Sequence, residues 1–161
     1  MEEKEQVEKL VEFAREVSKF LHITTPSIRY KEHGGYGSSW YDPETDTVYI
    51  GVEARTRDAY YDIAHEVRHK WQWVTDSDFY YSKYKEVGIV SLEKYRSQIS
   101  EIDADAFAVL MTAIYLNEVV KLNGYSNKEK ENIIRRAMKI AKEYNIKFPF
   151  EDYCGMMKIT L

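Results

Sequence analysis

The stretch His65-Glu66-Val67-Arg68-His69 lies inside a segment whose apolar residues follow a helical period. The apolar positions are Ile63, Ala64, Val67, Trp71 and Val74. This spacing predicts an amphipathic helix from Arg57 to about Val74, with Thr56 as its N-cap. Because four residues of an α-helix turn about 400° and rise about 6 Å, the two histidines project from one face of this helix, one turn apart.

Two imidazoles in this arrangement match the spacing of zinc ligands. Each can bring a nitrogen to within about 2.0–2.1 Å of a single zinc ion. A glutamate directly after the first histidine is placed to take a proton from a zinc-bound water. The pattern therefore makes His65 and His69 candidate metal ligands and Glu66 the candidate general base. The alternative interpretation is a surface helix whose histidines pair with carboxylates.

A catalytic zinc site needs a third protein ligand and an open position. We predict a strongly apolar helix from Glu101 to Val120, and Glu101 at its start is a candidate for that ligand. Asp105 follows one turn later on the same face, where it can accept a hydrogen bond from a ligand histidine. The other residues considered as ligands are His22, His33 and Cys154.

The residues between 40 and 116 resemble a known family. His-Glu-x-x-His at 65–69, followed by Glu-x-x-Ala-Asp-x-Phe-Ala at 101–108, is similar to the small gluzincin metallopeptidases, and most of all to minimal gluzincins and ImmA/IrrE-type peptidases. ImmA/IrrE proteins often work beside a helix-turn-helix repressor, whereas this chain shows no helix-turn-helix signature.

The resemblance implies a role for each matching residue. It implies that His65, His69 and Glu101 are the zinc ligands, that Glu66 is the general base and that Asp105 orients a histidine. It also implies that residues 47–51 form an edge strand that borders the substrate cleft, where an extended peptide would pair with the main chain.

Peptide hydrolysis also needs a group that stabilises the oxyanion, and a tyrosine often serves. Among the 14 tyrosines we favour Tyr95, which stands six residues before Glu101. Tyr80, Tyr81 and Tyr84 are the alternatives. For each of these the competing interpretation is core packing with a solvated hydroxyl.

The remaining segments predict an α+β fold in a single zincin-like domain spanning residues 1–161. A helical period of apolar residues, which includes Leu10, Ala14 and Val17, predicts an N-terminal helix at Glu2–Leu21. A small, mainly antiparallel sheet is expected to follow it. A linker from Thr75 then leads to the Glu101 helix, on which the 65–69 helix is expected to pack. The expected strands are Ser27–Tyr30, Tyr36–Tyr41 and Thr47–Val52. Ser126 and Glu129 form a capping-box pattern for a last helix to about Tyr144, and Gly124 is expected to stop the helix before it. Pro149 is expected to end regular structure within an apolar tail, Phe148–Leu161.

Composition describes an ordinary globular protein. The 161 residues are 44% hydrophobic and 31% charged, with a net charge of −4 and one cysteine. This balance disfavours disorder, wholesale nucleic-acid binding and a disulfide framework. No apolar run approaches the roughly 18 residues of a membrane span, and the acidic N-terminus lacks a secretory signal, so a cytoplasmic location is expected.

Together the motifs predict a zinc-dependent metallopeptidase that acts on a specific protein or peptide substrate. The predicted cofactor is Zn²⁺, and neither a nucleic acid nor a membrane is an expected partner. The alternative is a zinc-stabilised, non-catalytic binding or regulatory module, in which the metal contributes only folding energy.

Overall fold

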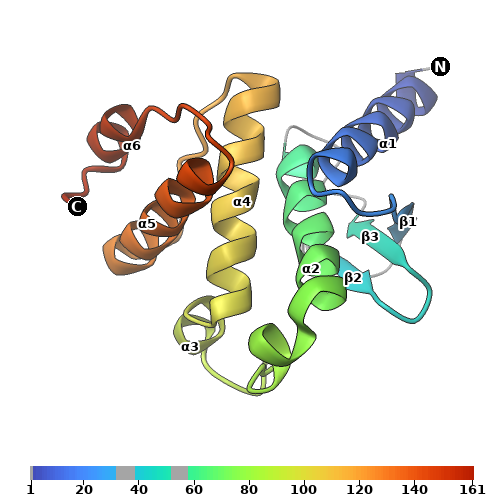
Figure 1. Ribbon diagram of the computed structural model, residues 1–161, viewed down its shortest axis with the longest axis horizontal. Helices are drawn as coiled ribbons and strands as arrows, with labels where there is room; N and C mark the ends of the chain where they lie inside the picture. The colour runs from blue at the N-terminus through green and yellow to red at the C-terminus, as the bar shows by residue number, and fades with distance from the viewer. Residues whose placement is uncertain (1, 32–38, 52–57) are drawn as a thin grey trace. The chain divides into compact units, whose positions relative to one another are not determined.

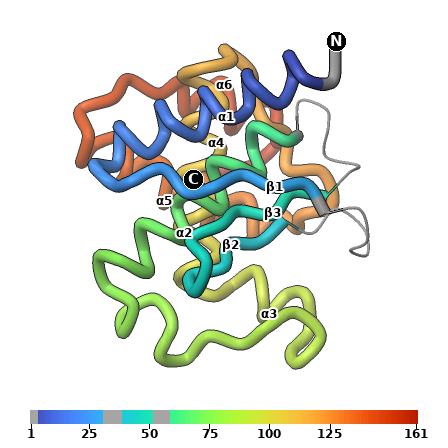
Figure 2. The backbone as a smooth tube through the Cα atoms, turned by 90° about the vertical axis from the view of Figure 1, so that its right-hand side faces the viewer, coloured from blue at the N-terminus to red at the C-terminus, as the bar shows by residue number. Residues whose placement is uncertain are grey.

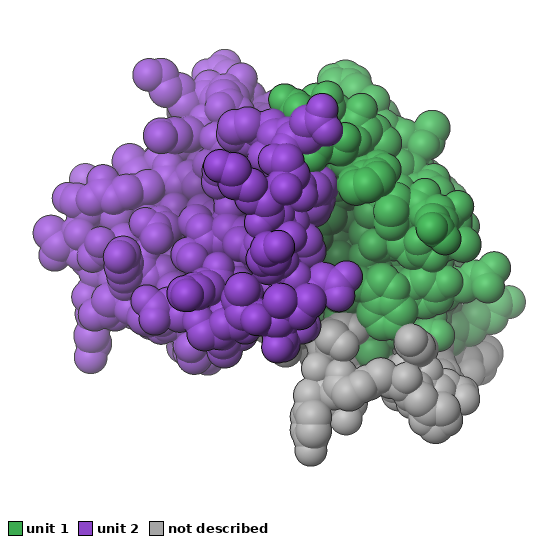
Figure 3. Space-filling model, turned by 90° about the horizontal axis from the view of Figure 1, so that it is seen from below, with its two compact units in different colours: residues 1–77 green, residues 78–161 purple. Residues whose placement is uncertain are grey.

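The computed structural model describes residues 2–31, 39–51 and 58–161. The chain divides into two compact units, unit 1 at residues 1–77 and unit 2 at residues 78–161 (Figure 3). Helices and a three-stranded sheet together make an α+β protein, as the sequence predicts. A single domain over residues 1–161 stays a prediction.

Unit 1 begins with helix α1 (Glu2–Phe20), close to its predicted bounds. Its apolar stripe is buried at Leu10, Ala14 and Val17, which explains the periodicity of this segment. The helix ends where His22 adopts a left-handed φ of 55°, and the amide of Ile23 donates to the carbonyl of Ser18 over 3.0 Å. This geometry is a common helix stop.

The sheet of unit 1 is mixed, with strand order β1-β3-β2 (Figure 2). Strand β2 (Trp40–Asp42) pairs antiparallel with β3 (Thr47–Gly51), as expected for a hairpin. Strand β1 (Ser27–Lys31) pairs parallel with β3, so the prediction of a mainly antiparallel sheet is wrong for this pair. The physical reason is that β1 and β2 run in opposite directions and the hairpin reverses the chain again, so β1 and β3 run in the same direction.

The same topology corrects the predicted position of the strand at 47–51 within the sheet. Strand β3 is hydrogen-bonded on both sides, to β1 and to β2, so it offers no free edge to a peptide. The prediction that residues 47–51 form an edge strand is therefore wrong. Val48 and Ile50 on β3 are fully buried, which is typical of a central strand.

Helix α2 (Asp58–Tyr81) carries the 65–69 motif and runs beyond its predicted end. At Asp76 the backbone leaves helical geometry, with φ −156° and ψ 72°, and the helix resumes after this kink. Part of the segment expected to be a linker is therefore helical. Within unit 1, α2 contacts α1 through the rings of Tyr60 and Phe13, whose centroids lie 5.1 Å apart.

Unit 2 is helical, with α3 (Leu92–Arg96), α4 (Ile99–Leu116), α5 (Asn127–Glu143) and α6 (Phe150–Met157) (Figure 1). Helix α4 ends at Asn117, which takes a left-handed φ of 51°, and not at Gly124 as expected, because asparagine tolerates this conformation. The capping box of Ser126 and Glu129 at the start of α5 is confirmed.

The C-terminal tail contradicts the expectation that Pro149 ends regular structure. Pro149 is instead the N-cap residue of α6, and a proline at a helix start costs no backbone hydrogen bond. Tyr153 on α6 is fully buried, and its ring lies 4.6 Å from that of Phe148. Burial of these aromatic rings explains why the tail is ordered as a helix.

Among the described residues, none of the helices has both the length and the apolar character that crossing a membrane requires.

Candidate metal centre

The histidine pair of α2 has the geometry expected of two ligands to one metal. The Nε2 atoms of His65 and His69 lie 2.9 Å apart, with the ring planes at 80°. Two nitrogens bound tetrahedrally to one zinc would lie about 3.3 Å apart, which follows from zinc–nitrogen bonds of about 2.0–2.1 Å. A small adjustment of either ring therefore suffices, and the predicted projection from one helix face is confirmed.

A glutamine that the sequence analysis did not single out holds the second histidine. The Nδ1 atom of His69 lies 2.9 Å from Oε1 of Gln72, three residues later on the same helix. Gln72 is fully buried and His69 is only 9% exposed. The spacing of three residues on a helix was visible in the sequence, but nothing there showed that the amide turns toward the ring.

The candidate general base is also buried and hydrogen-bonded. Glu66 is 5% exposed, and its Oε1 accepts a hydrogen bond of 3.0 Å from the hydroxyl of Ser39. Ser39 directly precedes strand β2. One carboxylate oxygen of Glu66 is thus tied to the start of an edge strand, a contact between positions 27 residues apart that sequence reasoning missed.

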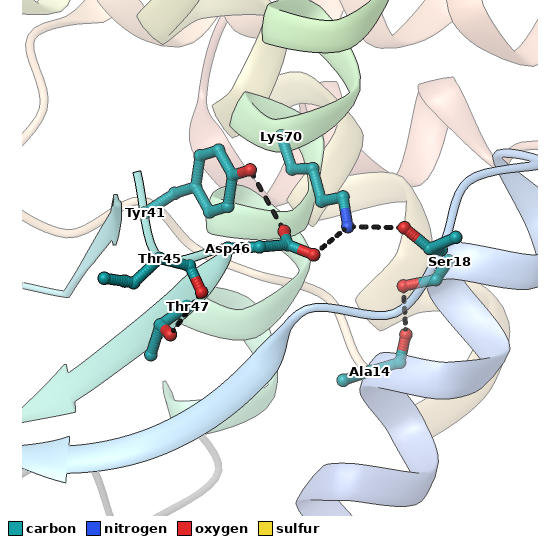
Figure 4. A network of polar contacts seen from close by, with 8 residues as sticks. Ala14, Ser18, Tyr41, Thr45, Asp46, Thr47 and Lys70 are labelled. Carbon is teal, nitrogen blue, oxygen red and sulfur yellow. Dashed lines mark hydrogen bonds and ion pairs between the residues drawn. The ribbon is translucent and has the colours of Figure 1, made fainter. Parts of the chain in front are cut away.

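A lysine next to the second histidine anchors that turn of α2 to its surroundings (Figure 4). The buried ammonium group of Lys70 donates to the carboxylate of Asp46 and to the hydroxyl of Thr24, each over 2.8 Å. Tyr41 donates to the other oxygen of Asp46 over 3.0 Å. Burial, together with this hydrogen bond, raises the pKa of Tyr41 above its usual range. The network joins α2 to the β2–β3 turn and to the segment after α1.

In unit 2, the candidate third ligand lies beside two of the predicted tyrosines. Glu101 is 3% exposed in the first turn of α4. The hydroxyl of Tyr84 lies 3.4 Å from Oε1 of Glu101 and 3.3 Å from the hydroxyl of Tyr95. Burial, and then the negative charge of Glu101, raise the pKa of Tyr95 well above its ordinary value. A tyrosine phenol can act as a hydrogen-bond donor.

The two aspartates that follow Glu101 have partners within unit 2. Asp103 is buried and accepts from Arg136 on α5 over 2.7 Å. Asp105 accepts from the hydroxyl of Tyr125 over 3.2 Å. The role of Asp105 in orienting a ligand histidine stays a prediction.

One group of candidate metal ligands is present among the described residues. A nitrogen of His65, a nitrogen of His69 and a carboxylate oxygen of Glu101 all lie within 4.8 Å of one another. Two imidazoles and one carboxylate are a donor set that catalytic zinc sites use, with a fourth position left open. The residues present therefore fit a zinc ion.

The remaining candidate ligands lie elsewhere in the chain. His22 is exposed in the turn after α1, and Cys154 is partly exposed on α6. His33 lies outside the described residues. Neither His22 nor Cys154 belongs to the group formed by His65, His69 and Glu101.

No family model matches the chain, and neither the curated proteins nor the solved structures contain a match.

Proposed function

We propose that this protein is a zinc-dependent metallopeptidase of the gluzincin type. The observation that carries the proposal is the group formed by His65, His69 and Glu101, whose ligand atoms lie within 4.8 Å of one another. Glu66 directly follows the first ligand, His65, in the sequence. Its carboxylate is buried and accepts a hydrogen bond from Ser39. These features match a hydrolytic zinc site more closely than a purely structural one, which usually has four protein ligands.

Each residue has a distinct role in this proposal. His65, His69 and Glu101 hold the metal. When bound, zinc polarises a carbonyl group and lowers the pKa of water. Glu66 accepts the proton of the attacking water and returns it to the leaving amine.

The tyrosines supply the remaining donor. A tyrosine phenol is protonated at neutral pH, so Tyr95 can donate a hydrogen bond to a carbonyl oxygen that gains negative charge. Tyr84 lies 3.3 Å from Tyr95 and holds the phenol by hydrogen bonding.

The proposed substrate is a protein or peptide in extended conformation. Strand β2 is an edge of the described sheet, and the residue just before it contacts the proposed general base. A peptide that pairs with an edge strand gains affinity from main-chain hydrogen bonds. We therefore propose that the substrate pairs with the edge strand β2 and not with the central strand β3.

The first test is metal content. We expect elemental analysis to find about one zinc per chain in the wild type, and none in His69→Ala, because two remaining ligands hold zinc weakly. Absence of zinc from the wild type after zinc is offered would remove the basis of the proposal.

The second test separates an enzyme from a zinc-stabilised binding module. Glu66→Gln should retain zinc and lose cleavage of a quenched fluorescent peptide library by at least about 100-fold, the low end for a general base. Glu8→Gln, an exposed position on α1, is the matched control and should cleave like the wild type. Zinc binding without any cleavage by the wild type would support the non-catalytic module instead.

A further inference from the structure

The second histidine of the candidate metal centre has both ring nitrogens engaged. Nδ1 of His69 lies 2.9 Å from Oε1 of Gln72, and Nε2 lies 2.9 Å from Nε2 of His65. An amide oxygen can only accept a hydrogen bond, so this contact is a hydrogen bond only in the tautomer of His69 that carries its proton on Nδ1. The lone pair of His69 is then on Nε2 and faces the other histidine.

This arrangement also defines the hydrogen bond between the two rings. With the lone pair of His69 on Nε2, the 2.9 Å contact between the two Nε2 atoms is a hydrogen bond when Nε2 of His65 carries a proton. For both histidines to bind one metal ion through Nε2, the proton on Nε2 of His65 must leave that nitrogen, by transfer to Nδ1 of the same ring or, from a doubly protonated ring, to solvent. The site is thus arranged so that only one nitrogen of His69 is able to bind a metal ion.

We propose that Gln72 is a positioning residue that selects the tautomer of His69 and so sets the metal affinity of the site. The inference deepens the proposed function and depends on the same metal centre. Gln72 acts through His69 and is not itself a ligand. Its complete burial supports this role, because the amide is held at a fixed distance from the ring within one helix.

The choice of an amide over a carboxylate has a chemical consequence. Partners of ligand histidines are often carboxylates, which raise the basicity of the imidazole. A neutral amide fixes the tautomer without adding a charge at a buried position, where an unpaired carboxylate is costly. We therefore expect Gln72 to give a correctly oriented ligand with moderate metal affinity.

The decisive experiment uses nitrogen–proton long-range NMR correlations on the metal-free full-length protein. The wild type should show His69 with its proton on Nδ1. In Gln72→Met, which keeps the length of the side chain and removes the acceptor, the tautomer should be mixed or reversed. A wild-type His69 that carries its proton on Nε2 would overturn the inference without any variant.

The second measurement is the zinc affinity, which is determined by competition with a chromophoric chelator. Gln72→Met should weaken zinc binding by about 10–100-fold, the usual effect of removing a partner of a ligand histidine. Gln72→Glu retains an acceptor and should bind zinc at least as tightly as the wild type. Gln6→Met, at a partly buried glutamine on α1, is the control and should leave affinity unchanged.

The outcomes separate this inference from the proposed function. The expected tautomer and affinities, together with no cleavage of peptides by the wild type, would support the role of Gln72 and contradict the peptidase proposal. Unchanged zinc affinity in Gln72→Met, in a protein that melts like the wild type, would overturn the role of Gln72 whether or not the protein cleaves peptides.

Discussion

The histidines of unit 1 and the glutamate of unit 2 are supported in different ways. On α2, one helix supplies His65, His69 and the glutamine that holds the second ring. On α4, Glu101 is contacted by Tyr84, a residue of the segment before α3, which lies 17 positions away in the chain. The 3.6-residue period of one helix is therefore sufficient to bring together two histidine ligands and the glutamine that contacts one of them. Placing the carboxylate of Glu101 requires contacts between residues far apart in the chain.

The largest expected effect tests the assignment of Glu101 against its neighbour. Glu101→Ala should weaken zinc binding by more than about 100-fold, beyond the range for residues that only contact a ligand. Asp103→Ala should leave zinc affinity within a few-fold but lower the free energy of unfolding by about 1.5–3 kcal/mol, because it removes a charged hydrogen bond to Arg136. Chelator competition and urea unfolding measure the two quantities. Equal losses of zinc affinity in both variants would show that Glu101 is not the ligand.

The second-largest expected effect concerns the ion pair of Lys70 and Asp46, which anchors α2. Substitution of one partner should cost more stability than substitution of the other. Asp46→Asn leaves the ammonium of Lys70 buried without its carboxylate, so we expect a loss of about 2–3 kcal/mol in the free energy of unfolding. Lys70→Met removes the buried charge and leaves the half-exposed Asp46 to solvent, so the loss should be about 1 kcal/mol or less. Thermal unfolding at neutral pH compares them. A greater loss in Lys70→Met than in Asp46→Asn would contradict this account of the network.

The smallest effect concerns a local signal in unit 2. Ser126→Ala removes the side-chain acceptor of the capping box at the start of α5 and should lower the free energy of unfolding by about 1 kcal/mol. Zinc affinity should not change, since the cap belongs to a different helix from any candidate ligand. Unfolding and chelator titration of the same sample measure both properties. A marked loss of zinc affinity would mean that α5 supports the metal centre directly.

Local patterns account for the features that were predicted well. The apolar period at Leu10, Ala14 and Val17 predicted α1, and the pair Ser126 and Glu129 predicted the start of α5. The 65–69 motif predicted two histidines on one face of a helix, and their Nε2 atoms lie 2.9 Å apart. In each case the interacting residues are within a few turns of one helix, so their spacing in the sequence is enough to predict the local structure.

The predictions that failed depend on pairing or packing between distant segments. The parallel pairing of β1 with β3 and the central place of β3 depend on which strand finds which neighbour. The helix of the C-terminal tail depends on burial of Tyr153 beside Phe148, which overrides the proline signal. Ser39 and Gln72 were missed because their side-chain directions depend on the folded chain.

By itself, the sequence determined the α+β composition, the helical histidine pair with its adjacent glutamate, and the capping signals, because these follow from the 3.6-residue period and from short-range hydrogen bonding. Only the tertiary structure decided the strand order, the contact of Ser39 with Glu66 and the tyrosines that accompany Glu101. The physical reason is that such contacts join residues far apart in the chain, and their free energy is gained only when the whole core is buried.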